Sequence, residues 1–500
     1  MQVIRGGLLL DAPAHKAEAR DLLLNGDTIE EIGRPGLAAP EGTEVIDATG
    51  RLLIPGLVNA HTHSHGALSK GLGDRWTLEL LLNAGPWITG GQTPEDRYTG
   101  TLLNAAEMIR RGCTATYDLT WEFPAPSAAG IEGVAKAYDD IGLRALVAPM
   151  LADTNLYQSV PGLMGALPED LQKKVAGFRF GDFKPMVDAC KTLLKDWPHD
   201  RERIDLALAP TIPLFCSEEF LIACRNLAEE HGARIHTHLA ESKIQALTGL
   251  ERYGMTLTAY FDQLGLITER FTGAHGVWLD SDDRKRLADR GASIALNPGS
   301  NLRLGSGIPD ARALLDAGVT VAVASDGSSS SDNQNMFEAA RLTAYTSRVL
   351  SHDPERWLSN SETFQLATEG GAKAMGMERS IGKIAPGFKA DIVFLDLDDL
   401  AYVPLNDPVN QIIQADDGSS VESVMIGGAF VYRNRQFTTI DLAKLIADAR
   451  AARARLNELG AERKALAGRL APLVTKHCAC FAARRYHIAR MGFGPGKTAE

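Results

Sequence analysis

The sequence predicts an α/β protein with three parts: a (β/α)8 TIM-like barrel, a small β-sandwich built from both ends of the chain, and a C-terminal helical extension. Eight apolar, strand-like runs begin at residue 51 and alternate with helix-like stretches, which is what a parallel barrel requires. The chain has 500 residues, whereas a barrel alone takes roughly 250. We therefore expect sandwich segments at 1–56 and 376–436, the barrel at 57–375 and the extension at 437–500.

The two ends of the chain carry the pattern of antiparallel strands. The first 50 residues are short apolar runs broken by Gly, Pro and Asp, as in "LLLNGDTIEEIG", which favours strands and tight turns. Strand-like runs return after residue 376 in "GKIAPGFKADIVFLD" and "VESVMIGGAFVYRNRQF". The next stretch, "DLAKLIADARAARARLNELGAERKALAGRL", predicts one long, charged amphipathic helix. The final "GFGPGKTAE" is expected to be frayed and does not match a phosphate-binding loop.

The central region carries the barrel strands, and helix-end signals separate them. The helix "TPEDRYTGTLLNAAEMIRRG" is a clear case, because Thr93 is a cap residue, Pro94 suits the first helical position and Gly112 ends the helix. The eight strand runs are, in order, "LLIPGLVNA", "CTATYDL", "RALVAPML", "IDLALAP", "ARIHTHLA", "FTGAHGVWL", "ASIALNP" and "VTVAVASDG".

Composition restricts the class of partner. Hydrophobic residues make up 45% and charged residues 23%, as in ordinary globular proteins. A net charge of −11 without a basic stripe argues against nucleic acid as a partner. No secretory signal and no run of about 18 apolar residues is present, so we expect a cytoplasmic protein and no membrane partner. The six scattered cysteines fit neither a disulfide framework nor a zinc ribbon, and no metal role is expected for "HCAC" at His477 to Cys480.

Two histidine pairs mark the candidate site. His61 and His63 end an apolar strand, and residues two apart on a strand share a face, so both imidazoles can bind one ion. The run "ARIHTHLAE" repeats this pattern with His236 and His238, and Glu241 follows three residues later. We interpret His236 as a core residue.

The polar residues of the predicted barrel fall at the carboxyl ends of its strands, where barrels hold catalytic groups. His61 and His63 end the first strand, His238 the fifth, His275 the sixth and Asp326 the eighth. Three neutral imidazoles and one carboxylate suit one divalent metal ion, zinc or iron, with an open position for water. The H-x-E/P-C-x-x-C pattern of cytidine deaminases and the H-E-x-x-H pattern of metalloproteases are both absent from the sequence.

Seven blocks within residues 1 to 435 form one ordered set: "IPGLVNAHTH", "TPEDRYTGTLLNAAEMIRRGCTATYDL", "HTHLAES", "GAHGVWL", "ALNPGSNLRLGSGI", "ASDGSSSSDNQNMFEAAR" and "GKIAPGFKADIVFLD". Together they resemble the amidohydrolase superfamily, in particular its branch of cytosolic metal-dependent deaminases and chlorohydrolases. The resemblance implies four metal ligands, namely His61, His63, His238 and Asp326.

The resemblance also implies roles for two further residues. Glu241 matches the acid that moves protons, and His275 matches the histidine that polarises the attacking water or the nascent tetrahedral oxygen. In other branches a carbamylated lysine at the end of the fourth strand bridges two metals. No lysine ends the fourth strand here, "IDLALAPTIP", and this implies one metal.

The predicted chemistry is hydrolytic. A bound divalent ion lowers the pKa of its water, so that hydroxide can attack an amidine-like carbon at neutral pH. Glu241 can accept the water proton and pass it to a ring nitrogen, and Glu241 or Asp326 can help to protonate the departing amine. We therefore predict a deaminase that releases ammonia from an amino-substituted nitrogen heterocycle. Two alternatives stay open: hydrolysis of another C–N bond, as in an amide, a urea or an alkylamino- or halo-triazine, and a non-catalytic barrel homologue.

Two groups that would bind a nucleoside are missing. The resemblance to deaminases of adenosine-type thioethers implies a histidine after the fourth strand and an acid before the "TPED" helix. The chain has "APTIPLFCS" after that strand and no Asp or Glu between Glu79 and Glu95. A small free heterocycle is therefore the expected substrate. His65, Trp87 and Trp121 are candidate substrate contacts, and a homo-oligomer is left open.

Overall fold

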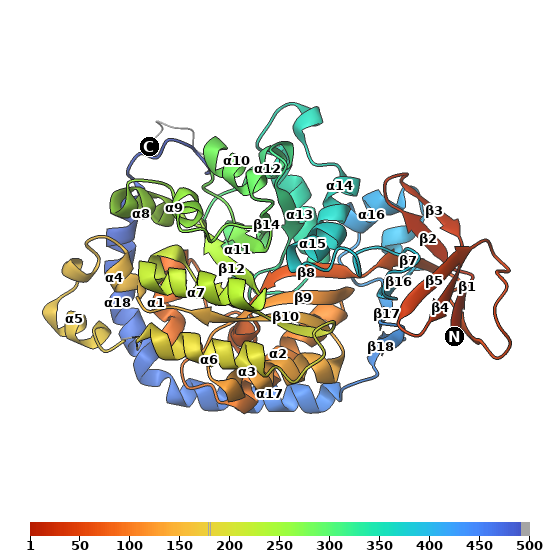
Figure 1. The fold of residues 1–500 in the computed structure, drawn as a ribbon, viewed down its shortest axis with the longest axis horizontal. Helices are drawn as coiled ribbons and strands as arrows, with labels where there is room; N and C mark the ends of the chain where they lie inside the picture. Colours follow the sequence, from red (N-terminus) through yellow and green to blue (C-terminus); the bar gives the residue numbers. More distant parts are fainter. Residues whose placement is uncertain (179, 181, 492–500) are drawn as a thin grey trace.

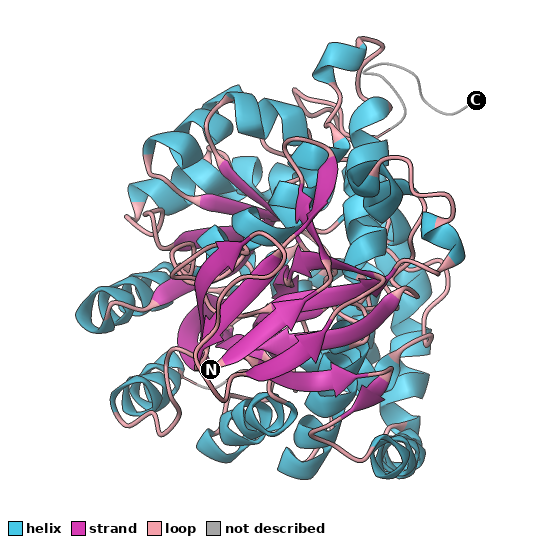
Figure 2. Cartoon of the chain, turned by 90° about the vertical axis from the view of Figure 1, so that its right-hand side faces the viewer, coloured by secondary structure: helices cyan, strands magenta, loops and turns pink. Residues whose placement is uncertain are grey.

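A computed structural model describes residues 1–178, 180 and 182–491. Its longest axis runs from a β-rich part through the barrel to the last long helix (Figure 1). Figure 2 looks from the β-rich side and shows helices surrounding the strands. The predicted fold class is confirmed. Residues 492–500, the end of the predicted extension, lie outside the described residues.

Two sheets form the sandwich, one made of N-terminal strands alone and one made from both chain ends. Their strand orders are β5-β4-β1-β6 and β19-β18-β17-β16-β7-β2-β3. Most neighbours are antiparallel as predicted, but β1 with β6 and β2 with β7 are parallel. Leu22, Ile46 and Phe394 belong to the core between the sheets. The strands are β1 Gln2–Arg5, β2 Leu8–Asp11, β3 Lys16–Ala19, β4 Asp21–Asn25, β5 Thr28–Gly33, β6 Glu44–Asp47, β7 Arg51–Pro55, β16 Ile392–Asp396, β17 Val421–Ile426, β18 Ala429–Arg433 and β19 Gln436–Phe437.

Eight parallel strands form the barrel in sequence order. The first predicted run is divided at Gly56, so its first half pairs in the sandwich and its second half opens the barrel. A Cβ at Gly56 would lie 1.9 Å from Thr114 Oγ1, so only glycine fits there. The strands are β8 Leu57–Thr62, β9 Cys113–Thr120, β10 Arg144–Leu151, β11 Ile204–Pro210, β12 Arg234–Leu239, β13 Phe271–His275, β14 Ser293–Leu296 and β15 Thr320–Val323.

Helices cover the outside of the barrel. The helix α2 begins at Pro94 as predicted, and Thr93 and Asp96 exchange hydrogen bonds in a capping box. The α-helices before the extension are α1 Leu78–Ile88, α2 Pro94–Ile109, α3 Ala128–Ile141, α4 Leu156–Ser159, α5 Glu169–Val175, α6 Phe183–Lys195, α7 Glu218–His231, α8 Lys243–Tyr253, α9 Leu257–Gln263, α10 Ser281–Asp289, α11 Pro298–Arg303, α12 Ala311–Asp316, α13 Met336–Arg348, α14 Asn360–Gln365, α15 Gly371–Met375 and α16 Pro408–Gln414.

The described part of the C-terminal extension, up to residue 491, contains two helices, α17 (Leu442–Leu459) and α18 (Ala461–Ala482), and the prediction of one long helix was wrong. The break falls at Gly460, where a Cβ would lie 3.0 Å from Cδ1 of Trp87, so the chain passes close to this indole. Beyond the break α18 runs beside α1 (Figure 1), and the Asn83 side chain donates a hydrogen bond to Ala467 O over 3.1 Å. The second helix of the extension therefore packs against the helices of the barrel.

A buried ion pair fixes the sandwich to the barrel. Arg144 at the start of β10 donates from Nε to Asp391 Oδ2 over 2.8 Å and from Nη2 to Oδ1 over 3.2 Å. The side chains are 4% and 2% exposed. Loss of one partner would leave a buried, uncompensated charge. None of the helices in the described part of the chain has the length and hydropathy needed to cross a bilayer.

Candidate metal and active site

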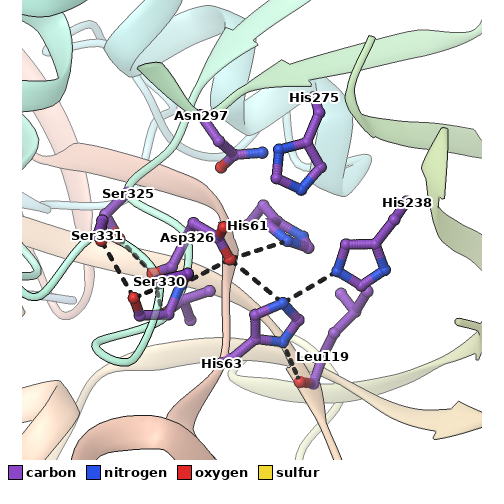
Figure 3. A network of polar contacts seen from close by, with 12 residues as sticks. His61, His63, Leu119, His238, His275, Asn297, Ser325, Asp326, Ser330 and Ser331 are labelled. Carbon is purple, nitrogen blue, oxygen red and sulfur yellow. Dashed lines mark hydrogen bonds and ion pairs between the residues drawn. The ribbon is translucent and has the colours of Figure 1, made fainter. Parts of the chain in front are cut away.

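Four predicted ligands converge at the carboxyl ends of the barrel strands. Figure 3 shows the rings of His61, His63 and His238 and the carboxylate of Asp326 turned toward one another. The ligand atoms of the three histidines lie within 4.8 Å of one another. Asp326 Oδ1 lies 3.3 Å from Nε2 of His63 and 3.5 Å from Nε2 of His61. Strands far apart in the sequence thus supply the ligands of one candidate metal centre.

The hydrogen bonds behind the rings decide which nitrogens face this centre. His63 Nδ1 lies 2.7 Å from Leu119 O, and His238 Nδ1 lies 2.6 Å from Thr211 O. Each Nδ1–H donates to its carbonyl, so each Nε2 carries a lone pair. The two Nε2 atoms are only 3.0 Å apart. Two lone pairs at this distance repel each other unless a cation lies between them, so the donor arrangement fits a metal ion.

The charge state of the ligands also fits a metal. Burial lowers the pKa of His61 to about 3, so its imidazole is neutral, and neither of its ring nitrogens has a hydrogen-bond partner. Burial alone would raise the pKa of Asp326, but the contact with His61 and the nearby His63 and His275 hold it well below its usual range. Three imidazoles and one carboxylate are a usual zinc donor set.

The backbone at two of these strand ends is strained. His275 has φ of 71° and Asp326 has φ of 65°, a region that non-glycine residues rarely adopt. The Asp326 N–H donates to His61 O over 3.0 Å across the junction of β15 and β8. Strain of this kind persists where the surrounding structure holds it in place, and it is common at functional sites.

Glu241 and His275 form a buried pair beside the ligands. Glu241 is 1% exposed, and its Oε2 lies 3.6 Å from Nε2 of His275. Neither atom has a hydrogen-bond partner. Burial raises the pKa of Glu241 well above its usual range, and the charges of Asp326 and Glu79 add to this effect. His275 Nδ1 lies 2.9 Å from Asn301 Oδ1 and donates to it, so the Nε2 lone pair is directed into the site.

His236 does not join the ligand cluster. Its ring is fully buried, 4.9 Å from the ring of His61 and 4.4 Å from that of Tyr117. Neither ring nitrogen has a hydrogen-bond partner. Its position in the barrel interior agrees with its interpretation as a core residue.

A cavity of about 410 Å³ opens onto these groups. His63, His238, Glu241, His275 and Asp326 line one part of it. Six aromatic side chains line another part, and the ring centroids of Trp121 and Phe123 each lie 5.6 Å from that of Phe180. The six are Trp121, Phe123, Tyr157, Phe178, Phe180 and Phe215. A flat, apolar ring fits such a wall.

Two of the three predicted substrate contacts line the cavity, and the third does not. His65 and Trp121 line the cavity. The Trp121 N–H donates to His65 Nδ1 over 3.0 Å, and burial lowers the pKa of His65, so its single ring hydrogen is on Nε2. Trp87 does not line the cavity, contrary to expectation. Trp87 is buried because α18 covers this face of α1. Its ring centroid lies 6.2 Å from that of Trp76, and the Lys464 ammonium lies 5.1 Å from its ring centroid.

The cavity wall near the missing nucleoside-binding groups is mainly apolar. Thr211, Ile212 and Phe215 follow the fourth strand, β11, and line the cavity where a histidine was absent. The residues from α1 that line it are apolar, among them Leu81 and Leu82. No lysine lies on the wall within the described residues.

Three residues at the site were missed by the sequence reasoning. Asn301, the partner of His275, lies in the quoted block "ALNPGSNLRLGSGI", so its polar character was available as a signal. Arg97 is 5% exposed, lines the cavity and donates to Trp121 O. Arg463 reaches the cavity from α18, and nothing in the sequence near it indicates this position.

The chain is similar to known proteins over most of its length. The sequence profile of the amidohydrolase family matches residues 52–431. The chain is 30% identical over 445 residues to the 5-methylthioadenosine/S-adenosylhomocysteine deaminase of Pyrococcus abyssi, covering 89% of this chain and 96% of the relative. It is 31% identical over 440 residues to the 5'-deoxyadenosine deaminase of Methanosphaera stadtmanae, covering 87% and 95%.

Solved structures are similar over nearly the same length. An adenosine deaminase from Xanthomonas campestris with bound zinc has a TM-score of 0.78 and 28% identity, covering 91% of this chain and 98% of the other. The atrazine chlorohydrolase of Arthrobacter aurescens, complexed with zinc, has a TM-score of 0.81 and 26% identity, covering 91% and 100%.

Proposed function

Because the chain belongs to the amidohydrolase family, we propose that it is a single-metal deaminase that hydrolyses an amino-substituted nitrogen heterocycle and releases ammonia. One observation carries this proposal: the imidazoles of His61, His63 and His238, the carboxylate of Asp326 and the buried carboxyl of Glu241 meet beside an aromatic-lined cavity. The similarity to enzymes named as deaminases supports the reaction type.

Zinc is the proposed metal. The ligands would be His61, His63, His238 and Asp326, and three nitrogens with one carboxylate are a usual set for zinc. Two similar structures are described with zinc. When bound, the ion would lower the pKa of water so that hydroxide is available at neutral pH. The lack of a lysine on the described wall supports one ion rather than two.

The residues around the ligands would move the protons. Water adds to the ring carbon that bears the amine, and Glu241 takes a proton from this water and passes it to the adjacent ring nitrogen. The His275 Nε2 lone pair can accept a hydrogen bond from the same water and so orient it. A second proton transfer through Glu241, with help from Asp326, converts the amine into a leaving group. The C–N bond breaks, ammonia leaves and a ring carbonyl remains.

The walls favour a free heterocycle. Trp121 and Phe180 offer apolar faces for a ring, and the Nε2–H of His65 can donate to a ring nitrogen or carbonyl oxygen. Ribose hydroxyls would meet Ile212, Phe215 and the apolar α1 face, and buried hydroxyls without partners cost binding energy.

We infer a cytoplasmic location and a small-molecule partner. The six cysteines carry no disulfide, and five of them are buried, which is consistent with a reducing compartment. A homo-oligomer remains a prediction that light scattering can test.

One assay tests the proposed function. Ammonia release is measured with zinc-loaded enzyme on purines, pyrimidines, pterins, triazines and guanidino compounds, and amides, ureas and halo-triazines are followed in parallel by loss of the intact compound. Release from a ring amine supports the deaminase. Cleavage of only amides, ureas or halo-triazines would assign the site to another C–N or C–halogen hydrolysis, and no turnover of any compound would favour the non-catalytic alternative.

A further inference from the structure

The C-terminal extension adds a charged side chain to the cavity. Arg463 lies in the first turn of α18, beyond the segment that matches the family. It is exposed and lines the same cavity as the metal ligands, so it stands at the mouth. A Cβ built on Gly90 would lie 3.0 Å from Arg463 Nη1, and one on Gly91 3.3 Å from it, so the guanidinium rests against this cavity-lining backbone.

The position of Arg463 is held by contacts one turn further along α18. The Tyr157 hydroxyl donates to Asn83 Oδ1 over 2.7 Å, and Asn83 Nδ2 donates to Ala467 O over 3.1 Å. Tyr157 itself lines the cavity. The side chain of the neighbouring Lys464 does not point to the cavity, because its ammonium lies over the ring of Trp87, which is not part of the cavity wall. The helix is thus tied to the cavity wall, and of these two cations Arg463 faces the opening.

The charge of Arg463 has no partner in the described residues. The other charged wall residues are Arg97, Glu122, Glu241 and Asp326. Asp326 lies against His61 and His63, and Glu241 lies beside His275.

Glu122 is also engaged. It accepts hydrogen bonds of 2.9 Å from both the N–H and the hydroxyl of Ser127, and it lies 3.8 Å from Arg97 Nε. Each described carboxylate of the wall therefore has its own neighbours, and the guanidinium at the mouth is left for a ligand.

We propose that Arg463 is a specificity-determining residue that binds an anionic substituent, a carboxylate or a phosphate, on the heterocyclic substrate. The inference rests on the proposed deaminase function and narrows its substrate class. A guanidinium forms bidentate hydrogen bonds with both anions. The amino group would lie at Glu241 and the anion at the mouth, with the ring between them against the aromatic wall.

Matched substrates test this proposal. The probes are 9-propyladenine, 9-(2-carboxyethyl)adenine and 9-(2-phosphonoethyl)adenine, together with pterin and pterin-6-carboxylate. The wild-type enzyme should prefer the anionic members by about tenfold in kcat/KM, a moderate factor because the contact is partly exposed. Arg463→Gln should abolish this preference by raising KM for the anionic members. The carboxylate and phosphonate arms identify which anion is bound more tightly.

Arg469→Gln is the matched control, because Arg469 lies on the same helix but pairs with Asp170 at 2.7 Å and does not line the cavity. It should keep the preference. Equal turnover of anionic and neutral members by the wild type, or an equal loss for both in Arg463→Gln, would overturn the proposal. If no probe and no panel compound releases ammonia, the deaminase function fails. Calorimetric binding of the same pairs to zinc-loaded protein would then decide the anion site alone.

Discussion

Replacing Glu241 with glutamine should lower kcat by about 10²- to 10⁴-fold and leave the metal bound, because glutamine keeps the shape of the side chain but cannot carry a proton. This loss corresponds to about 2.7–5.4 kcal/mol of transition-state stabilisation. The structure offers no substitute on the described wall, since Asp326 lies against His61 and His63 and Glu122 accepts two hydrogen bonds from Ser127. A position 1% exposed also leaves little room for bulk water to replace the carboxylate.

The assay is ammonia release at saturating substrate, with metal content and melting temperature measured on the same preparation. Glu122→Gln is the control, because it removes another wall carboxylate that is engaged with Ser127 and Arg97. It should retain most of the wild-type kcat. A Glu241→Gln enzyme that holds one metal, melts normally and turns over at more than a tenth of the wild-type rate would refute the assignment of Glu241 as the proton carrier.

Four further outcomes are expected. The wild type should hold about one tight metal per chain, and His63→Ala or His238→Ala should lose most of it; full retention in elemental analysis would show that the site is misplaced. Free heterocycles should exceed their nucleosides in kcat/KM, and the opposite order would contradict the role given to the apolar wall. The pKa of Glu241 is raised above its ordinary 4.5, first by burial and then by Asp326 and Glu79. Since Glu241 must be ionised to accept a proton, kcat/KM should fall as the pH drops through its pKa, and a pH profile of kcat/KM without an acidic limb would contradict this role. Asp391→Ala should lower the free energy of unfolding by about 3–5 kcal/mol, because it leaves the buried charge of Arg144 without a partner. A loss under about 1 kcal/mol in a denaturant titration would argue against that ion pair.

Local signals in the sequence were sufficient for the barrel strands and for several helix ends. All eight predicted runs overlap a barrel strand, because apolar runs of strand length are encoded within a few residues. The start of α2 at Pro94 follows from Thr93 and Asp96 alone. The extension was predicted less well: the break falls at Gly460, a residue type that favours helix ends, and the chain there lies against Trp87, hundreds of residues earlier.

For the site, too, some features follow from neighbours along the chain and others only from the folded structure. The two-residue spacing of His61 and His63 already requires that both imidazoles share a face, and this holds for any strand. Chain order alone could not say that Trp87 would be covered by α18, or that Arg463 would reach the cavity.

By itself the sequence determined the elements, the residue types available as ligands and the absence of particular groups, because these depend on neighbours along the chain. The tertiary structure decided which lone pairs face each other, as with the two Nε2 atoms held 3.0 Å apart by the carbonyls of Leu119 and Thr211. It also decided which side chains form the cavity wall. The physical reason is that side-chain direction, burial and pKa are set by groups distant in sequence, and packing brings these groups together only in the folded chain.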